Sequence, residues 1–253
     1  MSYATIEELL DRMRADLDDL TAAGDARRFF HATYMRTTKA VGQEIARGGF
    51  LDGDWVLRWD LAFAELYTDA ALGAARAGQP IPGPWRVAFD TAASRPGAPP
   101  LQHVLFGINA HINFDLPQAL LAVISPAEFD DPAILRRRAD DHRHVDYVLQ
   151  SRVGAEDDEL GAVSRVTVLD RLLRPANRAA SRRFLAEARA KVWHNAVVLD
   201  RARRAGADVY AAALIELERR CAARVLDLTR PGPVLLRLAR IGFGVLLPPD
   251  TPQ

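Results

Sequence analysis

Hydrophobic residues recur along most of this chain at intervals of three and four, the spacing that lines one face of an α-helix. The first example follows Thr5, with Glu8 at capping-box spacing, and its apolar positions are Ile6, Leu9, Leu10, Met13 and Leu17. No long segment alternates strictly between polar and apolar residues, as a half-buried strand would. The pattern therefore predicts an all-α protein.

Breaks in this pattern divide the chain into about eight to ten helices. A run of Pro and Gly at 95–100 lets one of them begin near Leu101. We expect this helix, from about 101 to 116, to be buried at the centre of the fold, because it is apolar and nearly free of charge. The other predicted helices begin near Ile6, Asp25, Asp54, Trp85 and Ser125 or cover about 132–153, 158–173, 177–204 and 206–228. No shift in composition divides residues 1–253, so we predict a single domain.

The C-terminal segment 231–249 is the most apolar part of the chain. It is too short, and too interrupted by Arg237 and Arg240, to cross a bilayer. One interpretation is that it packs against the domain. The other is that it makes a weak contact with an anionic membrane surface, which two arginines beside a bulky apolar face would suit.

Composition limits the partners. The chain has 253 residues, of which 49% are hydrophobic, enough for a substantial core. Its 33 basic and 33 acidic residues cancel, which argues against nucleic acid and leaves a small molecule as the expected partner. The single cysteine, Cys221, excludes an intramolecular disulfide and a cysteine-based zinc cluster. Residues 1–11 are polar and lack an apolar signal region, so we expect a cytoplasmic protein; the oligomeric state is not indicated.

Polar side chains interrupt the predicted central helix in a regular way. His103, Gly107, His111 and Asp115 recur every four residues and so share one slowly rotating face. Asn109 and Asn113 form a second pair one helical turn apart. Burying such groups without partners is costly, which makes this helix the candidate site.

A second polar cluster lies in the predicted helix 132–153. Asp141 and His144 have the i,i+3 spacing of the carboxylate and histidine pairs that project metal ligands into helical bundles. Together with His111 and Asp115 they offer two imidazoles and two carboxylates, a set that suits zinc, iron or manganese. The alternative is that the buried groups only satisfy neighbouring backbone, and that the charged run is a solvated face.

Two resemblances extend this interpretation. From about Phe29 to Arg240 the chain resembles a family of all-helical proteins found mainly in actinobacteria, for which no activity is established. The resemblance rests on the runs Trp85-Arg86-Val87-Ala88-Phe89-Asp90, Leu101-Gln102-His103 and Gly107-Ile108-Asn109-Ala110-His111-Ile112-Asn113-Phe114-Asp115-Leu116, and on the Pro231-Gly232 turn. It implies the fold and the location of a site without implying a reaction.

The other resemblance is local. Gly107-x-x-x-His111-x-x-x-Asp115, followed by Pro117, is similar to the central helix of zinc-dependent phospholipases C and the related fungal nucleases. This similarity implies that His111 and Asp115 are zinc ligands. The chain departs from those enzymes at its N-terminus, where they carry a Trp and this chain begins Met1-Ser2-Tyr3.

Two classes of function remain. The first is a metal-dependent hydrolase of an ester or phosphoester, in which His111, Asp115, Asp141 and His144 hold the ion. There Asp141 and His144 would also serve catalysis, and Asn109, Asn113 and His103 would bind substrate. The second is a metal-free helical pocket that binds or cyclises a small apolar molecule, with walls formed by Trp55, Trp59, Phe106 and Phe114. A scaffold role with the apolar C-terminal segment as docking element is a third interpretation, and whether the chain is an enzyme stays open.

Overall fold

Helices account for all the regular secondary structure among the residues that the structure describes. The computed structural model describes the backbone of residues 3–163, 168–230, 232 and 234–249, and their side chains outside 150–186, 235, 236 and 239. The helices are α1 (Ile6–Ala22), α2 (Arg28–Ala46), α3 (Gly53–Tyr67), α4 (Ala74–Arg76), α5 (Gly83–Ser94), α6 (Pro100–Ala110), α7 (Leu116–Val123), α8 (Pro126–Asp130), α9 (Pro132–Val163), α10 (Val168–Ala205), α11 (Ala207–Leu228) and α12 (Val234–Ile241), with two π-helical segments, η1 (Thr68–Gly73) and η2 (His111–Asp115). The all-α prediction is confirmed for this part of the chain.

Sequence signals set several of the helix starts. The Thr5 hydroxyl accepts a hydrogen bond from Glu8 N at 3.1 Å, and Ser125 forms a full capping box with Glu128 at the start of α8. The predicted separate helices 158–173 and 177–204 are wrong, because α9 runs to Val163 and α10 begins at Val168. Residues 164–167, within the first of these, lie outside the described residues.

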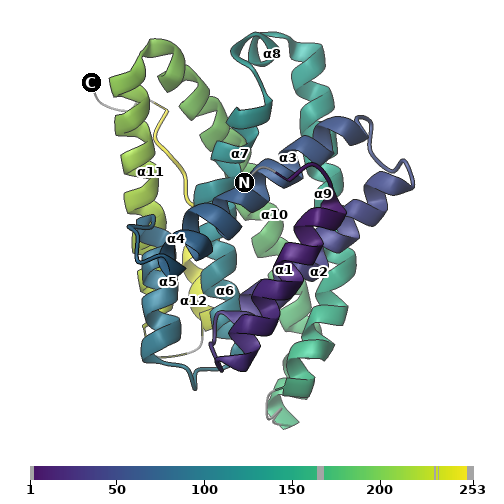
Figure 1. Cartoon of the computed structure of the whole chain (residues 1–253), viewed down its shortest axis with the longest axis vertical. Helices are drawn as coiled ribbons and strands as arrows, with labels where there is room; N and C mark the ends of the chain where they lie inside the picture. Colours follow the sequence, from purple (N-terminus) through teal and green to yellow (C-terminus); the bar gives the residue numbers. More distant parts are fainter. Residues whose placement is uncertain (1–2, 164–167, 231, 233, 250–253) are drawn as a thin grey trace.

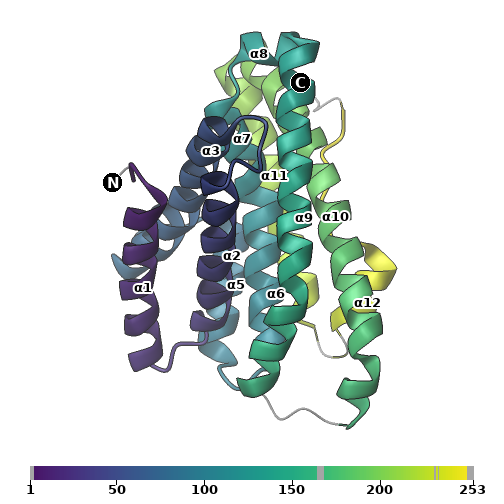
Figure 2. The ribbon, with the colours of Figure 1, turned by 90° about the vertical axis from the view of Figure 1, so that its right-hand side faces the viewer.

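A continuous helical rod formed by α6, η2 and α7 runs through the middle of the molecule. It packs against α2, α3 and α5 on one side and against α10 and α11 on the other (Figures 1 and 2). All residues from Ala110 to Pro117 are buried. The prediction of a buried central helix is therefore confirmed.

The rod widens into a π-helical turn at the candidate site. The Leu116 N–H bonds to the carbonyl of His111, five residues back instead of four. Pro117 explains this turn, since it has no N–H to donate and its ring would clash with the Asn113 carbonyl in a regular helix. Single π turns within α-helices are frequent at functional sites.

The C-terminal segment packs against the helices in an extended form. After α12 the chain runs alongside α11 (yellow in Figure 1), where Phe243, Val245 and Leu247 are buried and the intervening Leu246 is 46% exposed. This alternation is the side-chain pattern of a strand, although no strand is present among the described residues. Packing of the described part of 231–249 is thus confirmed, while membrane contact stays a prediction. None of the described helices combines the length and hydropathy that crossing a membrane requires.

Candidate functional site

His111 and Asp115 form a buried pair on the π-helical turn. His111 Nδ1 lies 2.8 Å from Asp115 Oδ2, and the Trp85 indole N–H donates to the same oxygen at 2.8 Å. Both side chains of the pair are almost completely inaccessible to solvent. Two helices therefore fix the carboxylate, since Trp85 comes from α5.

Aromatic rings enclose the imidazole. Phe63 of α3 stacks on it with ring centroids 3.6 Å apart and planes 7° apart, and Tyr34 of α2 meets it edge-on at 4.5 Å. The rings of Phe30, Tyr67 and Trp85 complete the enclosure at 6.0, 5.9 and 5.8 Å. His111 Nε2 is buried among these rings without a hydrogen-bond partner.

Burial controls the protonation of this pair. Desolvation lowers the pKa of His111 well below its usual value, so the imidazole is neutral. Desolvation also raises the pKa of Asp115 well above its usual value, and the hydrogen bond from Trp85 opposes that shift. The His111–Asp115 pair thus shares one proton in a site shielded from solvent, and His111 Nε2 is buried without a hydrogen-bond partner.

Asp141 and His144, the other two predicted metal ligands, are engaged elsewhere. Asp141 accepts the N–H groups of Leu51 and Asp52 at 2.7 and 2.9 Å and so supports the loop before α3. His144 Nε2 lies 2.8 Å from Glu44 Oε1 of α2.

The structure does not bring the four predicted metal ligands together. Within the described part of the chain, no three His, Cys, Asp or Glu side chains are grouped so that they could hold a metal ion. The spacing of these residues along two helices predicted that their side chains meet. Instead, α9 packs beside α2 and the loop before α3, and Asp141 and His144 bond to residues there. The residues present do not fit a multidentate zinc, iron or manganese site.

Asn109 and Asn113, predicted to bind substrate, have structural partners. Asn109 Nδ2 donates to the Leu105 carbonyl at 2.9 Å, and its Oδ1 accepts from Asn113 at 3.3 Å. Asn113 also donates to the Phe243 carbonyl and accepts the Val245 N–H, at 3.3 and 3.1 Å. Both asparagines are fully buried, and their amides hold the helix and the C-terminal segment rather than facing a ligand site.

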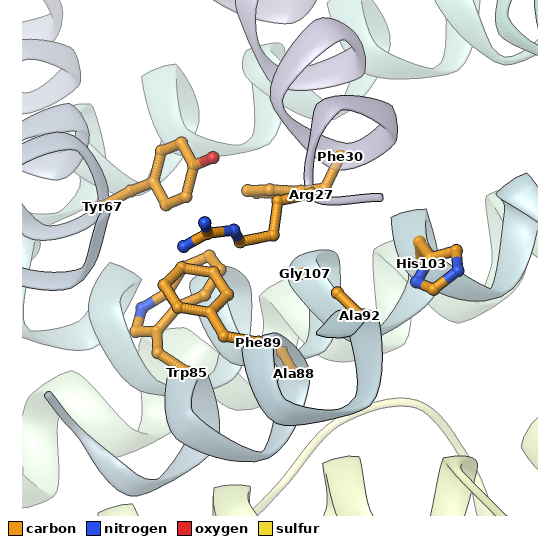
Figure 3. A pocket seen from close by; sticks show the side chains of 9 residues that line it. All are labelled: Arg27, Phe30, Tyr67, Trp85, Ala88, Phe89, Ala92, His103 and Gly107. Atoms are coloured by element: carbon orange, nitrogen blue, oxygen red, sulfur yellow. The ribbon is translucent and has the colours of Figure 1, made fainter. Parts of the chain in front are cut away.

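The cavity beside the pair is lined mainly by aromatic and small residues. Its free volume is about 10 Å³, room for about one water molecule, and it opens to solvent between α2, α5 and α6, with Tyr67 at the end of α3 (Figure 3). Phe30, Tyr67 and Trp85 belong both to its wall and to the enclosure of His111. Its full lining is Arg27, Phe30, Tyr67, Trp85, Ala88, Phe89, Ala92, His103 and Gly107.

His103 is the predicted substrate-binding residue that does line this cavity. It is 4% exposed, and neither ring nitrogen makes a hydrogen bond. Burial, followed by the charge of Arg28, lowers the pKa of His103, although nearby backbone at Arg95 and Ala98 opposes the shift. His103 is therefore neutral and presents one N–H donor and one nitrogen acceptor.

None of the four aromatic residues predicted as walls lines this cavity. Trp55 and Trp59 stack on each other and also contact Arg138, His142 and Arg189. Phe106 and Phe114 are buried but do not line the cavity. The aromatic walls of the cavity come from α2, the end of α3 and α5, and in the sequence only the run Trp85 to Phe89 offered a signal for them.

These observations define an all-α protein with an aromatic-lined cavity beside a buried His–Asp pair. The chain belongs to the family described as "Family of unknown function (DUF5995)", whose model matches residues 6–231. Comparison with curated proteins and with solved structures finds no match. The family assignment supports the broader resemblance inferred from the sequence, whereas the local similarity to zinc-dependent phospholipases C is not shown.

Proposed function

We propose that this protein binds a small, largely apolar molecule with a single ring at the cavity between α2, α5 and α6, without a metal ion, and that side chains at the mouth of the cavity move to admit the ring. The observation that carries the proposal is the aromatic-lined cavity itself. Phe30, Tyr67, Trp85 and Phe89 supply ring faces and edges, while Ala88, Ala92 and Gly107 leave the space between them. Pockets for small molecules combine such apolar walls with a few polar groups that fix orientation.

Close helix packing keeps the cavity in shape. A Cβ atom added at Gly107 would lie 2.2 Å from the Phe30 ring, so glycine is what lets α6 approach α2 at this point. Trp85 is anchored by its bond to Asp115, and Phe30 packs edge-on against Tyr67 at 5.0 Å. These contacts hold the inner wall in place, so the side chains at the mouth of the cavity are the ones that must move to admit a ring.

The expected affinity follows from ligand size. A molecule of about ten non-hydrogen atoms gains roughly 0.3 to 1 kcal/mol per atom in a good pocket. The dissociation constant should then fall between about 50 nM and about 6 mM, the range to search.

Filling the cavity tests the proposal. Ala92→Phe places a ring in the space, whereas Ala93→Phe adds the same ring at the exposed neighbouring position. Binding of phenylacetate, phenylacetamide and 2-phenylethanol is measured by calorimetry and ligand-observed NMR, with circular dichroism to verify the fold. We expect Ala92→Phe to weaken binding at least tenfold and Ala93→Phe to leave it within about twofold. If the wild type binds none of the three at several millimolar, or if a folded Ala92→Phe variant binds like the wild type, the proposal fails.

A metal-dependent hydrolase is the competing prediction. Elemental analysis of protein purified without chelator separates the two, because the hydrolase requires near-stoichiometric zinc, iron or manganese that is lost in His111→Ala. Such a result would overturn the metal-free proposal. Cyclisation of a bound molecule stays a prediction from the sequence alone.

A further inference from the structure

Arg27 is the one charged side chain in the lining of this cavity, and half of its guanidinium is committed. Its Nε and Nη2 both donate to Asp25 Oδ2, at 2.8 and 2.5 Å. The edge formed by Nη1 and the outer N–H of Nη2 has no partner among the described residues. This edge is one of the two that bind a carboxylate with paired hydrogen bonds.

The free edge lies among the aromatic walls. The guanidinium carbon is 5.1 Å from the centre of the Phe89 ring, and Figure 3 shows the group between Tyr67, Trp85 and Phe89. Its side chain is 23% exposed, while most of the lining is buried. Arg27 and Phe89 therefore form the mouth of the cavity, where a charged group of a ligand can stay partly hydrated.

Local charge favours an anion at this mouth. Arg27 and Arg28 stand beside one carboxylate, Asp25. Burial alone would raise the pKa of Asp25, but the hydrogen bonds from Arg27 and the charges of both arginines lower it, so Asp25 is ionised.

Tyr67 does not compete as a donor. His31 Nε2 lies 2.7 Å from the Met13 carbonyl and must donate to it, and burial lowers the pKa of His31, so the imidazole is neutral. His31 Nδ1 is then an acceptor, and the Tyr67 hydroxyl, 3.0 Å away, gives its proton to it. Toward the cavity Tyr67 offers lone pairs, which leaves Arg27 as the group suited to a negative ligand oxygen.

We infer that the ligand of this cavity is an organic carboxylate with a single apolar ring, its carboxylate paired with the free edge of Arg27 and its ring held by Phe30, Trp85 and Phe89. This inference rests on the proposed function and assigns the chemical class of the ligand.

The experiment compares an acid with its neutral isostere. Phenylacetate and phenylacetamide have nearly the same shape and differ in charge, so the ratio of their dissociation constants measures the contribution of the anion. In the wild type we expect phenylacetate to bind at least about tenfold more tightly, a difference of about 1.4 kcal/mol. The same ratio is measured in Arg27→Gln, Arg28→Gln and the double variant Asp25→Asn/Arg27→Gln.

The double variant is needed because Arg27→Gln alone leaves the Asp25 carboxylate unpaired, and that charge would itself repel phenylacetate. In the double variant both charges are gone, and we expect the acid and the amide to bind within about twofold of each other. Arg28→Gln is the matched control, since Arg28 lies over Phe29 outside the lining, and it should keep most of the preference.

Each failure has a distinct signature. Equal binding of acid and amide by the wild type, or a preference that survives in the double variant, overturns the carboxylate inference while leaving the pocket intact. Absence of binding of both compounds to the wild type, or amide binding that Ala92→Phe does not weaken, overturns the proposed function instead.

Discussion

The central rod carries two buried polar pairs with the same sequence spacing, and the two pairs differ in their hydrogen bonding. Asn109 and Asn113 lie on one face, His111 and Asp115 on another, each pair four residues apart and each fully buried. Every polar atom of the asparagine pair has a partner, whereas His111 Nε2 has none. Spacing and burial alone therefore do not separate a structural pair from one beside a cavity.

The difference lies in what covers each face. The backbone of Phe243 and Val245 closes the asparagine face, and Asn195 of α10 continues the arrangement by bonding to Val245 and Leu247. Aromatic side chains close the histidine face, and rings cannot satisfy a nitrogen lone pair or N–H as a backbone group does. The asparagine face joins the central rod to the C-terminal segment, and the histidine face lies against rings that also line the cavity.

Removing the C-terminal segment that covers Asn109 and Asn113 should have the largest effect on the free energy of unfolding. A chain ending at Ile241 loses the buried side chains of Phe243, Val245 and Leu247 and leaves the amides of Asn113 and Asn195 without partners. At about 1.5 to 3 kcal/mol for each buried side chain, the free energy of unfolding should fall by about 5 kcal/mol or more. Urea denaturation measures this, and a chain ending at Pro249 is the control. A loss below about 1 kcal/mol would show that the segment is not part of the folded unit.

The histidine face should depend on pH through Asp60, whose charge acts on Tyr34, one of the rings that enclose the imidazole. Burial raises the pKa of Asp60 to about 7, above its value of 3.8 in an unfolded chain. The folded state then holds a proton that the unfolded state releases, so this contribution to stability is greatest near pH 4 and declines as the pH rises to about 7. At pH 8, Asp60→Asn should raise the free energy of unfolding by about 2 to 4 kcal/mol.

The profile of stability against pH tests this sign. Relative to the wild type, Asp60→Asn should gain stability as the pH rises from 4 to 7, and the exposed Asp18→Asn should reproduce the wild-type profile. A wild-type stability that rises steadily over this range, with Asp60→Asn destabilising at pH 8, would contradict the prediction.

Substitution of Asn113 gives a smaller loss than truncation. Asn113→Leu keeps the volume but leaves the Phe243 carbonyl and the Val245 N–H buried without partners. The expected cost is about 2 to 3 kcal/mol, because each unsatisfied buried group costs about 1 to 3 kcal/mol. Asn109→Leu is the comparison, and it should cost less, since the Leu105 carbonyl it bonds belongs to the same helix. Equal costs for both variants would mean that the C-terminal segment contributes nothing to the difference.

Substitution of His111 should have the smallest effect. His111→Phe keeps the stacking on Phe63, removes the unpaired Nε2 and leaves Asp115 bonded to Trp85. We expect a change in the free energy of unfolding of about 1 kcal/mol or less, measured by thermal and urea denaturation. A loss above 3 kcal/mol would show that the His111–Asp115 hydrogen bond stabilises the fold as strongly as the hydrogen bonds of Asn113 to the C-terminal segment.

The sequence alone determined the helical class, the buried central helix and the pairing of His111 with Asp115, because helical periodicity places these residues on one face whatever surrounds the helix. It also identified Thr5 and Ser125 as helix caps, since capping depends on residues three positions apart. Local spacing was sufficient in each case because the partners lie within one turn of the same helix.

Only the tertiary structure decided what those residues do. Asp141 and His144 have ligand spacing, yet both are occupied by α2 and by the loop before α3, about 90 or more positions away in the chain. Arg27, Tyr67 and Trp85 carry no shared pattern in the sequence and meet in one cavity only because α2, α3 and α5 pack on the same side of α6. The physical reason is that the role of a buried polar group depends on its hydrogen-bond partner. In this fold most such partners come from segments distant in the chain, and local spacing does not predict which distant segments pack together.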